Sequence, residues 1–528
     1  MNRREVIKSA TAAGIALAAG RIAASAEQQS RPAGPDAGPP QRPNVLVIYA
    51  DQHRIDCMGA YGNREIRTSN LDAVAADGVR FSNSFCPLHF CTPSRYSFLS
   101  GLWVHEHQAW GNHATPRPGT PMFPAIMRAA GYRTKAVGKM HFTPTYLDVG
   151  FDEMELAEQD GVGRFDDDYH RWLKGQDLAD GIDLEDQRSE YRSRAPAEYW
   201  ETFGARRSDL DEAHYSTTWI ADRAVETVSK WTGGGNLLMV GFIKPHHPFD
   251  PPAPWDRMYD PEKMTPLAGW TDAPLPRDIE FSGGYFPHAK LTLPALKRVM
   301  AHYYATISEI DFHVGRMTDV LRRKGLYDST MIVYTADHGE YMGFHHLLLK
   351  GNLGYDPLMK VPLIIKYPGG AARGTVSDAL VSAVDLAPTI LRQALCRPAE
   401  KMRGLDLAAG GRREIVFSEM PGASQLVART AGHKLILRNP REKSLFFDLK
   451  ADPLEMENLY GRPECQAEVE RLSKAIEEWR GPAGPTRAYL DENAPVINQP
   501  NVPKRDDNHR QEMIAYFQRK LGLAPGKQ

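Results

Sequence analysis

The sequence predicts an α/β fold: a large, doubly wound, mostly parallel sheet flanked by helices, with a smaller C-terminal antiparallel sheet plus helix subdomain. Three observations predict it. Apolar runs of strand length alternate with helical patterns, two of those runs end in an Asp, and the pattern changes to short strands from about Arg413. Strands that alternate with helices form largely parallel sheets, and the sites of such sheets lie at the strand C-termini.

The elements of the large sheet are expected in a regular order. The strands are expected at residues 44–50, 133–138, 236–242 and 330–336, with helices at 123–131 and 295–324. Segments 151–235 and 250–293 are polar, rich in Trp and Tyr and poorly periodic, so we expect them to be insertions that wall a pocket.

Length and pattern together predict two folded parts. A chain of 528 residues exceeds the usual size of a single core. We expect a larger domain over residues 43–410 and a C-terminal subdomain and tail over residues 411–528. The subdomain should contain short antiparallel strands near residues 415–417, 435–437 and 445–449, and a helix over 466–479.

The first residues have the pattern of an export signal. Arg3 and Arg4 precede a short apolar run over residues 10–20, and Ala24-Ser25-Ala26 offers a small-residue cleavage site. This pattern resembles a twin-arginine signal over residues 1–26, with a Pro/Gly/Gln linker over 27–42. We expect the twin-arginine export machinery as a partner and a periplasmic or secreted location; an uncleaved amphipathic helix or anchor is the alternative.

Charge and cysteine usage limit the remaining classes. The chain has 64 Lys+Arg against 66 Asp+Glu, which argues against nucleic acid as a partner. Its five cysteines show neither a disulfide framework nor a zinc pattern. The sequence leaves formation of a homo-oligomer open.

The most specific motif is Cys91-Thr92-Pro93-Ser94-Arg95, closed by Leu99-Ser100-Gly101. It resembles the maturation signature of type I sulfatases, in which a cytoplasmic formylglycine-generating enzyme oxidises the Cys to formylglycine. The resemblance implies that one hydroxyl of the hydrated aldehyde attacks sulfur and forms a covalent sulfo-enzyme intermediate. The second hydroxyl then collapses to expel sulfate.

Two carboxylates follow two of the expected strands. Asp51-Gln52 comes after the first strand, and Asp337-His338 comes after the run 330–336. Either Asp alone could be a helix cap, but two at one sheet edge favour a metal site. The chain resembles the alkaline-phosphatase-like sulfatase family from about residue 43 to 479, and this implies that Asp51, Gln52, Asp337 and His338, with Cys91, bind one divalent ion.

Five further residues match positions that act on the ester in that family. Arg95 falls where the family holds the formylglycine hydrate, and Lys139 and His141 lie in a Gly-Lys-x-His segment that contacts sulfate and diol. His246 lies in a Pro-His-x-Pro-Phe segment and is the candidate acid for the leaving group. Lys350 matches the second sulfate-binding lysine.

The chain departs from the family at the metal. Many members have Asp-Asp where this chain has Asp51-Gln52, and Asp-Asn where it has Asp337-His338. An imidazole suits manganese or zinc better than calcium, which prefers oxygen ligands. The combination resembles phosphonate monoester and phosphodiester hydrolases and choline-sulfatase-like enzymes. We expect Ca²⁺ from the family as a whole, with Mn²⁺ as the alternative.

The resemblance implies a sulfuric ester hydrolase of the arylsulfatase type that acts on a small-molecule or glycan sulfate ester. Two alternatives stay open: a phosphonate monoester or phosphodiester hydrolase of the same superfamily, and an inactive glycan-binding pseudo-sulfatase. The presence of the complete set of candidate residues argues against the inactive form.

Overall fold

The computed structural model describes residues 42–279, 286–482, 484–503 and 507–523. The expected signal over residues 1–26, and all but the last residue of the expected linker, lie outside these residues. Within the described part of the chain, no helix is long and apolar enough to cross a membrane.

The larger domain is built on one eight-stranded sheet. In spatial order its strands are β4 (Glu153–Leu156), β3 (Arg133–Gly138), β5 (Asn236–Phe242), β1 (Asn44–Ala50), β6 (Thr330–Ala336), β7 (Leu363–Lys366), β2 (Val79–Phe85) and β8 (Thr375–Ser382). Only β7 runs antiparallel to its neighbours β6 and β2. The predicted fold class, a large and mostly parallel sheet, is confirmed.

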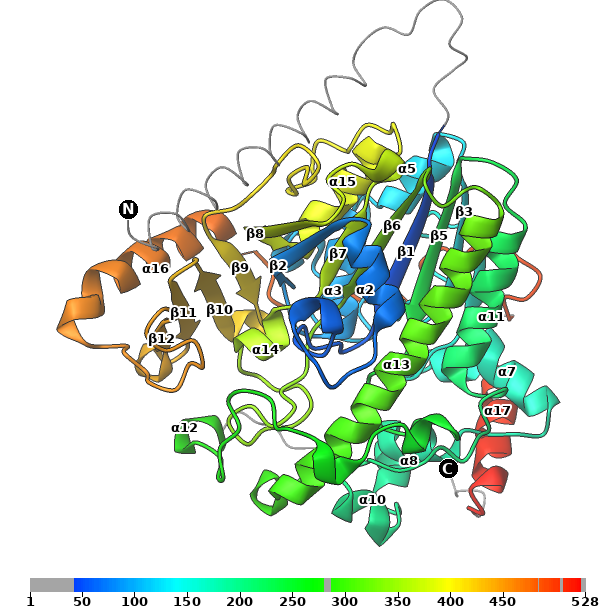
Figure 1. The fold of residues 1–528 in the computed structure, drawn as a ribbon, viewed down its shortest axis with the longest axis horizontal. Helices are drawn as coiled ribbons and strands as arrows, with labels where there is room; N and C mark the ends of the chain where they lie inside the picture. Colours follow the sequence, from blue (N-terminus) through cyan, green and yellow to red (C-terminus); the bar gives the residue numbers. More distant parts are fainter. Residues whose placement is uncertain (1–41, 280–285, 483, 504–506, 524–528) are drawn as a thin grey trace, which may run out of the picture.

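Helices cover both faces of this sheet (Figure 1). Alternate residues of β1 belong to two different core clusters, Val45, Val47 and Tyr49 to one and Leu46, Ile48 and Ala50 to the other. The first face packs against α3 (Cys91–Ser100), α5 (Phe123–Ala129) and α15 (Leu386–Gln393); the second packs against α2 (Ser69–Ala76), α11 (Ser216–Ser229) and α13 (Leu293–Arg323). Burial on both faces explains why β1 and β6 are apolar without alternation.

A separate four-stranded antiparallel sheet lies beside the large one (Figure 1). Its order is β12 (Leu445–Asp448), β11 (His433–Arg438), β10 (Gln425–Arg429) and β9 (Val416–Glu419), and helix α16 (Gln466–Arg480) covers it. Leu472 and Ile476 of α16 pack on the apolar side chains of this sheet. The predicted antiparallel sheet with a helix is therefore confirmed.

The segment 151–235 differs from the expectation of insertions alone. It supplies β4, which forms one edge of the large sheet, and α11, which packs on the sheet face. β4 has only four residues, and α11 begins with Ser-Thr-Thr, which are weak helix formers, so neither stands out in the sequence.

The remaining short helices are α4 (Val104–His107), α6 (Gly163–Asp166), α7 (Asp168–Gly175), α8 (Gly181–Gln187), α9 (Ser189–Arg192), α10 (Ala197–Glu201), α12 (Pro276–Ile279) and α14 (Asp356–Met359).

The C-terminal tail wraps back over the larger domain. Gln499 uses its side-chain amide to pair with both backbone groups of Met154 on β4, at 2.8 and 3.0 Å. Asn501 adds a third hydrogen bond to the Met154 carbonyl, at 3.1 Å. Helix α17 (Asp507–Lys520) then docks beside α6, where Arg510 pairs with Asp166 at 2.7 Å.

Candidate active site

Two neighbouring strands deliver the candidate metal carboxylates. β1 and β6 are parallel partners, with Ala50 opposite Ala336 at their C-terminal ends. Asp51 and Asp337 follow these two alanines directly, so the pairing alone brings the two carboxylates to one edge of the sheet. The backbone N–H of Gln52 donates to Asp337 Oδ1 at 3.0 Å, which ties the two strand ends together.

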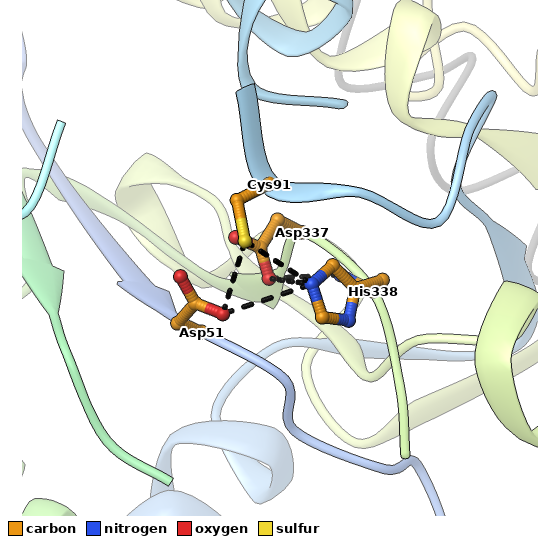
Figure 2. A group of neighbouring side chains, drawn as sticks. All are labelled: Asp51, Cys91, Asp337 and His338. Atoms are coloured by element: carbon orange, nitrogen blue, oxygen red, sulfur yellow. Dashed lines mark hydrogen bonds and ion pairs between the residues drawn. The ribbon is translucent and has the colours of Figure 1, made fainter. Parts of the chain in front are cut away.

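Cys91 comes from a third element, the first turn of α3. Its Sγ lies 3.6 Å from Asp51 Oδ1 and 3.4 Å from His338 Nε2 (Figure 2). The positive end of the α3 dipole lies at this turn and favours an anionic group there. Gly101, with φ +65°, ends the helix in the left-handed conformation, which explains why glycine closes the motif.

Asp51, Cys91, Asp337 and His338, called here the Cys91 cluster, present donor atoms that all lie within 4.8 Å of one another. His338 Nδ1 bonds the Gly339 carbonyl at 2.9 Å, so the ring donates there and its Nε2 faces the cluster. Metal-ligating histidines are commonly oriented by such a bond. The donor set and its orientation fit a divalent cation.

Three cations surround the Cys91 cluster. Arg95 bridges both carboxylates, at 3.1 Å from Asp51 and 2.9 Å from Asp337. Lys139 Nζ lies 2.8 Å from Asp51 Oδ2, and Lys350 Nζ lies 3.1 Å from Cys91 Sγ. Two carboxylates and a thiolate are thus matched by three fixed positive charges. A bound divalent ion would leave the site with net positive charge, as an anionic ester requires.

This arrangement shifts the acidity of the central groups. Burial raises the pKa of Asp51, but the charges of Lys139, Arg95 and Lys350 together hold it well below the usual value. Burial and the Asp51 charge also raise the pKa of the Cys91 thiol; Lys350, Lys139 and His338 outweigh them and bring it to about 6. Low-pKa cysteines are the reactive ones, whereas buried structural cysteines are inert.

The two candidate histidines lie beside these cations. His246 Nδ1 bonds the His247 carbonyl at 2.7 Å, which makes Nδ1 the donor, and its Nε2 lies 3.1 Å from Lys350 Nζ. Burial and then Lys350 lower the pKa of His246 well below its usual value, so the ring is neutral and accepts from Lys350. His141 follows Lys139 by two residues, and Thr92 Oγ1 donates to its backbone carbonyl at 3.0 Å.

Gln52 has a mixed environment. Its side-chain Nε2 donates to Glu340, and Glu340 also accepts from the backbone N–H of Met342 at 3.1 Å. Its Oε1 is buried and has no hydrogen-bond partner among the described residues. An oriented amide whose buried oxygen has no partner is compatible with the predicted role as a metal ligand.

The structure adds supporting residues that the sequence did not indicate. Gln159 accepts from Lys139 Nζ at 3.2 Å, and its own amide donates to Asp183 at 2.6 Å. His247 stacks on His246 with ring centroids 4.2 Å apart and pairs with Asp186 at 2.5 Å. Gln159, Asp183 and Asp186 belong to the segment expected only to wall the pocket, and no motif marks them. His247 is adjacent to a motif residue and could have been found from that position.

Comparison with known proteins gives the class to which this fold and site belong. The sulfatase family matches residues 43–394, so the chain belongs to the sulfatase family. It is accordingly a sulfuric ester hydrolase.

Similar proteins include an arylsulfatase and a phosphonate monoester hydrolase. An arylsulfatase of Clostridium perfringens is 28% identical over 473 residues, covering 82% of this chain and 94% of its own. The multifunctional alkaline phosphatase superfamily protein PehA of Trinickia caryophylli is 29% identical over 500 residues, covering 83% and 95%. The crystal structure of a phosphonate monoester hydrolase of Agrobacterium radiobacter superposes with a TM-score of 0.69 at 23% identity, covering 87% and 100%.

Proposed function

We propose that this protein hydrolyses sulfate esters by the attack of a formylglycine hydrate formed from Cys91, with one divalent ion bound in the Cys91 cluster. The observation that carries the proposal is the position of Cys91, at the start of a helix, between two carboxylates and a lysine. Converted to formylglycine, this residue offers two hydroxyls, one to attack sulfur and one to expel sulfate. In this structure the Cys91 Sγ stands in for those oxygens.

Asp51, Asp337 and His338 would hold the ion, with Gln52 Oε1 as a further donor. The ion would lower the pKa of the attacking hydroxyl and neutralise ester oxygens. Conversion of Cys91 to formylglycine replaces the soft thiolate by oxygen donors. Hard cations prefer oxygen ligands, so the conversion supports Ca²⁺ as the bound ion. The imidazole of His338 supports Mn²⁺ as the alternative.

Lys139, Arg95 and Lys350 would supply fixed positive charge around the non-bridging oxygens of the ester. Charge that is already in place before the reaction stabilises the transition state without reorganisation. His246 Nε2 lies 3.1 Å from Lys350 Nζ. We propose that His246 takes up a proton at Nε2 from solvent when the anionic ester binds and delivers it to the leaving oxygen, while Lys350 keeps its charge. We propose that His141 assists collapse of the covalent intermediate.

Mass spectrometry of active enzyme tests the nucleophile directly. Conversion of the thiol to the aldehyde lowers the mass of the Cys91 peptide by about 18 Da. Cys91→Ala should abolish turnover, whereas Cys86→Ala, at another buried cysteine, should retain it. Fully active material that contains only the thiol at position 91 would overturn the proposal.

A second candidate activity is hydrolysis of phosphonate monoesters or phosphodiesters. The Asp51-Gln52 and Asp337-His338 pairs favour it, and the similarity to the multifunctional protein PehA supports it. Rates on matched aryl sulfate, phosphonate monoester and phosphodiester substrates decide between the two. A higher kcat/KM on the phosphorus esters would make sulfate the secondary substrate.

We also propose export through the twin-arginine route, with residues 1–26 as the signal, 27–42 as the linker, 43–410 as the catalytic domain and 411–528 as the C-terminal subdomain and tail. Arg3 and Arg4 before a short apolar run support it. The route carries folded proteins, so Cys91 could be modified in the cytoplasm beforehand. Replacing both arginines by lysine should retain the protein in the cytoplasm, as cell fractionation would measure.

A further inference from the structure

A second group of metal-binding side chains lies next to the Cys91 cluster. His113, His141 and Asp160, called here the His113 cluster, each offer one donor atom, and these atoms lie within 4.8 Å of one another. The His113 and His141 rings meet edge to face with centroids 5.8 Å apart, and His113 Nε2 lies 3.6 Å from Asp160 Oδ2. None of these distances depends on the carboxylates of the Cys91 cluster.

The His141 imidazole is the least satisfied group of the three. The residue is only 4% exposed, and neither ring nitrogen has a hydrogen-bond partner among the described residues. A buried ring nitrogen without a partner is costly, and buried polar groups are nearly always satisfied by protein, water or an ion. The two nitrogens lie on different edges of the ring, so a ligand at one leaves the other free to bind a second group.

The other two residues are oriented toward this imidazole. Asp160 Oδ1 accepts from the backbone N–H of Gly161 at 2.6 Å, which leaves Oδ2 turned to His113. A Cβ on Gly161 would overlap the His113 ring, so a glycine is needed for the ring to lie where it does. The His113 side chain is 49% exposed and that of Asp160 is 30% exposed, which provides an entry path and room for a water ligand.

We propose that His113, His141 and Asp160 form a binding site for one divalent transition-metal ion, best matched by Zn²⁺. Two imidazoles and one carboxylate with an open fourth position are a common ligand set for zinc. Zinc–ligand distances of about 2.0–2.2 Å place tetrahedral donors about 3.4 Å apart, close to the separation of His113 and Asp160. Small rotations of the exposed His113 ring would close the remaining distance to His141.

An ion at this site would affect the neighbouring chemistry through His141. It would occupy one lone pair of the ring that we propose assists collapse of the covalent intermediate. Zn²⁺ at a concentration high enough to fill the site should therefore lower turnover. The loss of turnover should be smaller in a variant that cannot bind the second ion.

The test counts ions, so it does not depend on activity. Full-length protein is loaded with Co²⁺ or Zn²⁺, freed of loosely bound metal by gel filtration and analysed for metal per chain. Wild type should retain two equivalents, His113→Ala and Asp160→Asn one each, and the visible spectrum of tetrahedral Co²⁺ should disappear with either substitution. Affinity for the second ion should fall by about tenfold or more, since even indirect supporting residues cost that much.

Two controls separate this site from the Cys91 cluster and from surface binding. Asp337→Asn should remove the other equivalent, and its failure to do so would contradict the proposed function only. His214→Ala breaks the pair between His214 and Asp211, whose nearest atoms lie 2.6 Å apart at the surface. Among the described residues no third metal-binding side chain joins this pair, so the substitution should not change the number of bound ions. If His113→Ala and wild type bind the same number of ions with equal affinity, His113 and Asp160 form an ion pair only and the proposal is wrong.

Discussion

The Cys91 cluster and the His113 cluster lie side by side but balance their charges in different ways. In the first, Asp51 and Asp337 are fully buried, and Arg95 bridges them from a separate helix. In the second, the carboxylate is partly exposed, and its partner is a half-exposed imidazole carried on a loop. The difference teaches that the first site is built entirely into the fold, whereas in the second only His141 is buried, so His113 and Asp160 should tolerate change.

The largest effect is expected for Asp51→Asn in the first cluster, to be compared with Asp160→Asn in the second. Asp51→Asn should lower the free energy of unfolding by about 3–5 kcal/mol, because it leaves Arg95 and Lys139 buried without their shared carboxylate. Urea denaturation monitored by circular dichroism measures the change, and turnover should be lost even in the fraction that folds. A change as small as that of a surface substitution would contradict the view that the charges are interdependent.

The next largest effect is expected at the Lys350–His246 pair. Lys350→Ala should reduce kcat by about a hundredfold or more on every ester, because a charge aimed at the oxyanion is lost whatever the leaving group. His246→Ala should slow alkyl or sugar sulfates far more than nitrophenyl sulfate, since nitrophenolate leaves without protonation. Equal penalties for all leaving groups would mean that His246 positions the substrate, and His141 would become the candidate acid.

Unconverted, metal-free enzyme allows the electrostatics of the Cys91 cluster to be measured. The Cys91 thiolate should form as the pH rises through about 6, because the surrounding cations lower the pKa of this thiol. Cys86 is equally buried but lacks these cations, and burial raises the pKa of its thiol, so it should stay protonated to high pH. The ultraviolet thiolate absorbance of wild type minus Cys91→Ala gives the titration; a midpoint near the ordinary thiol value would exclude the proposed charge balance.

The smallest effect is expected at Asp160. Asp160→Asn, measured without added transition metal, should change the free energy of unfolding by less than about 1 kcal/mol. Its pair with His113 is partly exposed to solvent, and such pairs contribute little to stability. The same denaturation experiment that measures Asp51→Asn measures this change. A loss comparable to that of Asp51→Asn would show that the two clusters are one structural unit.

The sequence predicted the parts of the molecule that depend on strong local patterns. β1 and β6 are mostly apolar runs, and their parallel pairing is enough to bring Asp51 and Asp337 together. The motif that begins at Cys91 identified the candidate nucleophile, which the structure places in the first turn of α3. The resemblance to sulfatases supplied Lys139, His246 and Lys350, which periodicity alone could not connect.

The rest depends on contacts between distant segments that have no local pattern. Gln159 supports Lys139 from a loop after the short edge strand β4, and nothing in its neighbours indicates this. His113 and Asp160 come together only because their two loops meet above Gly161. Contacts of this kind depend on how distant segments pack together, and no local sequence pattern predicts them.

The pairing of Gln499 and Asn501 with Met154 has a consequence for the synthesis of the chain. An uncovered edge strand is a template for joining another molecule, and here the amides of two side chains occupy that template in place of a strand. β4 therefore stays uncovered until Gln499 and Asn501 have left the ribosome and folded back. A chain that stops before Gln499 would contain every residue of the Cys91 cluster but would leave the edge of β4 uncovered. We expect such a chain to self-associate through that edge.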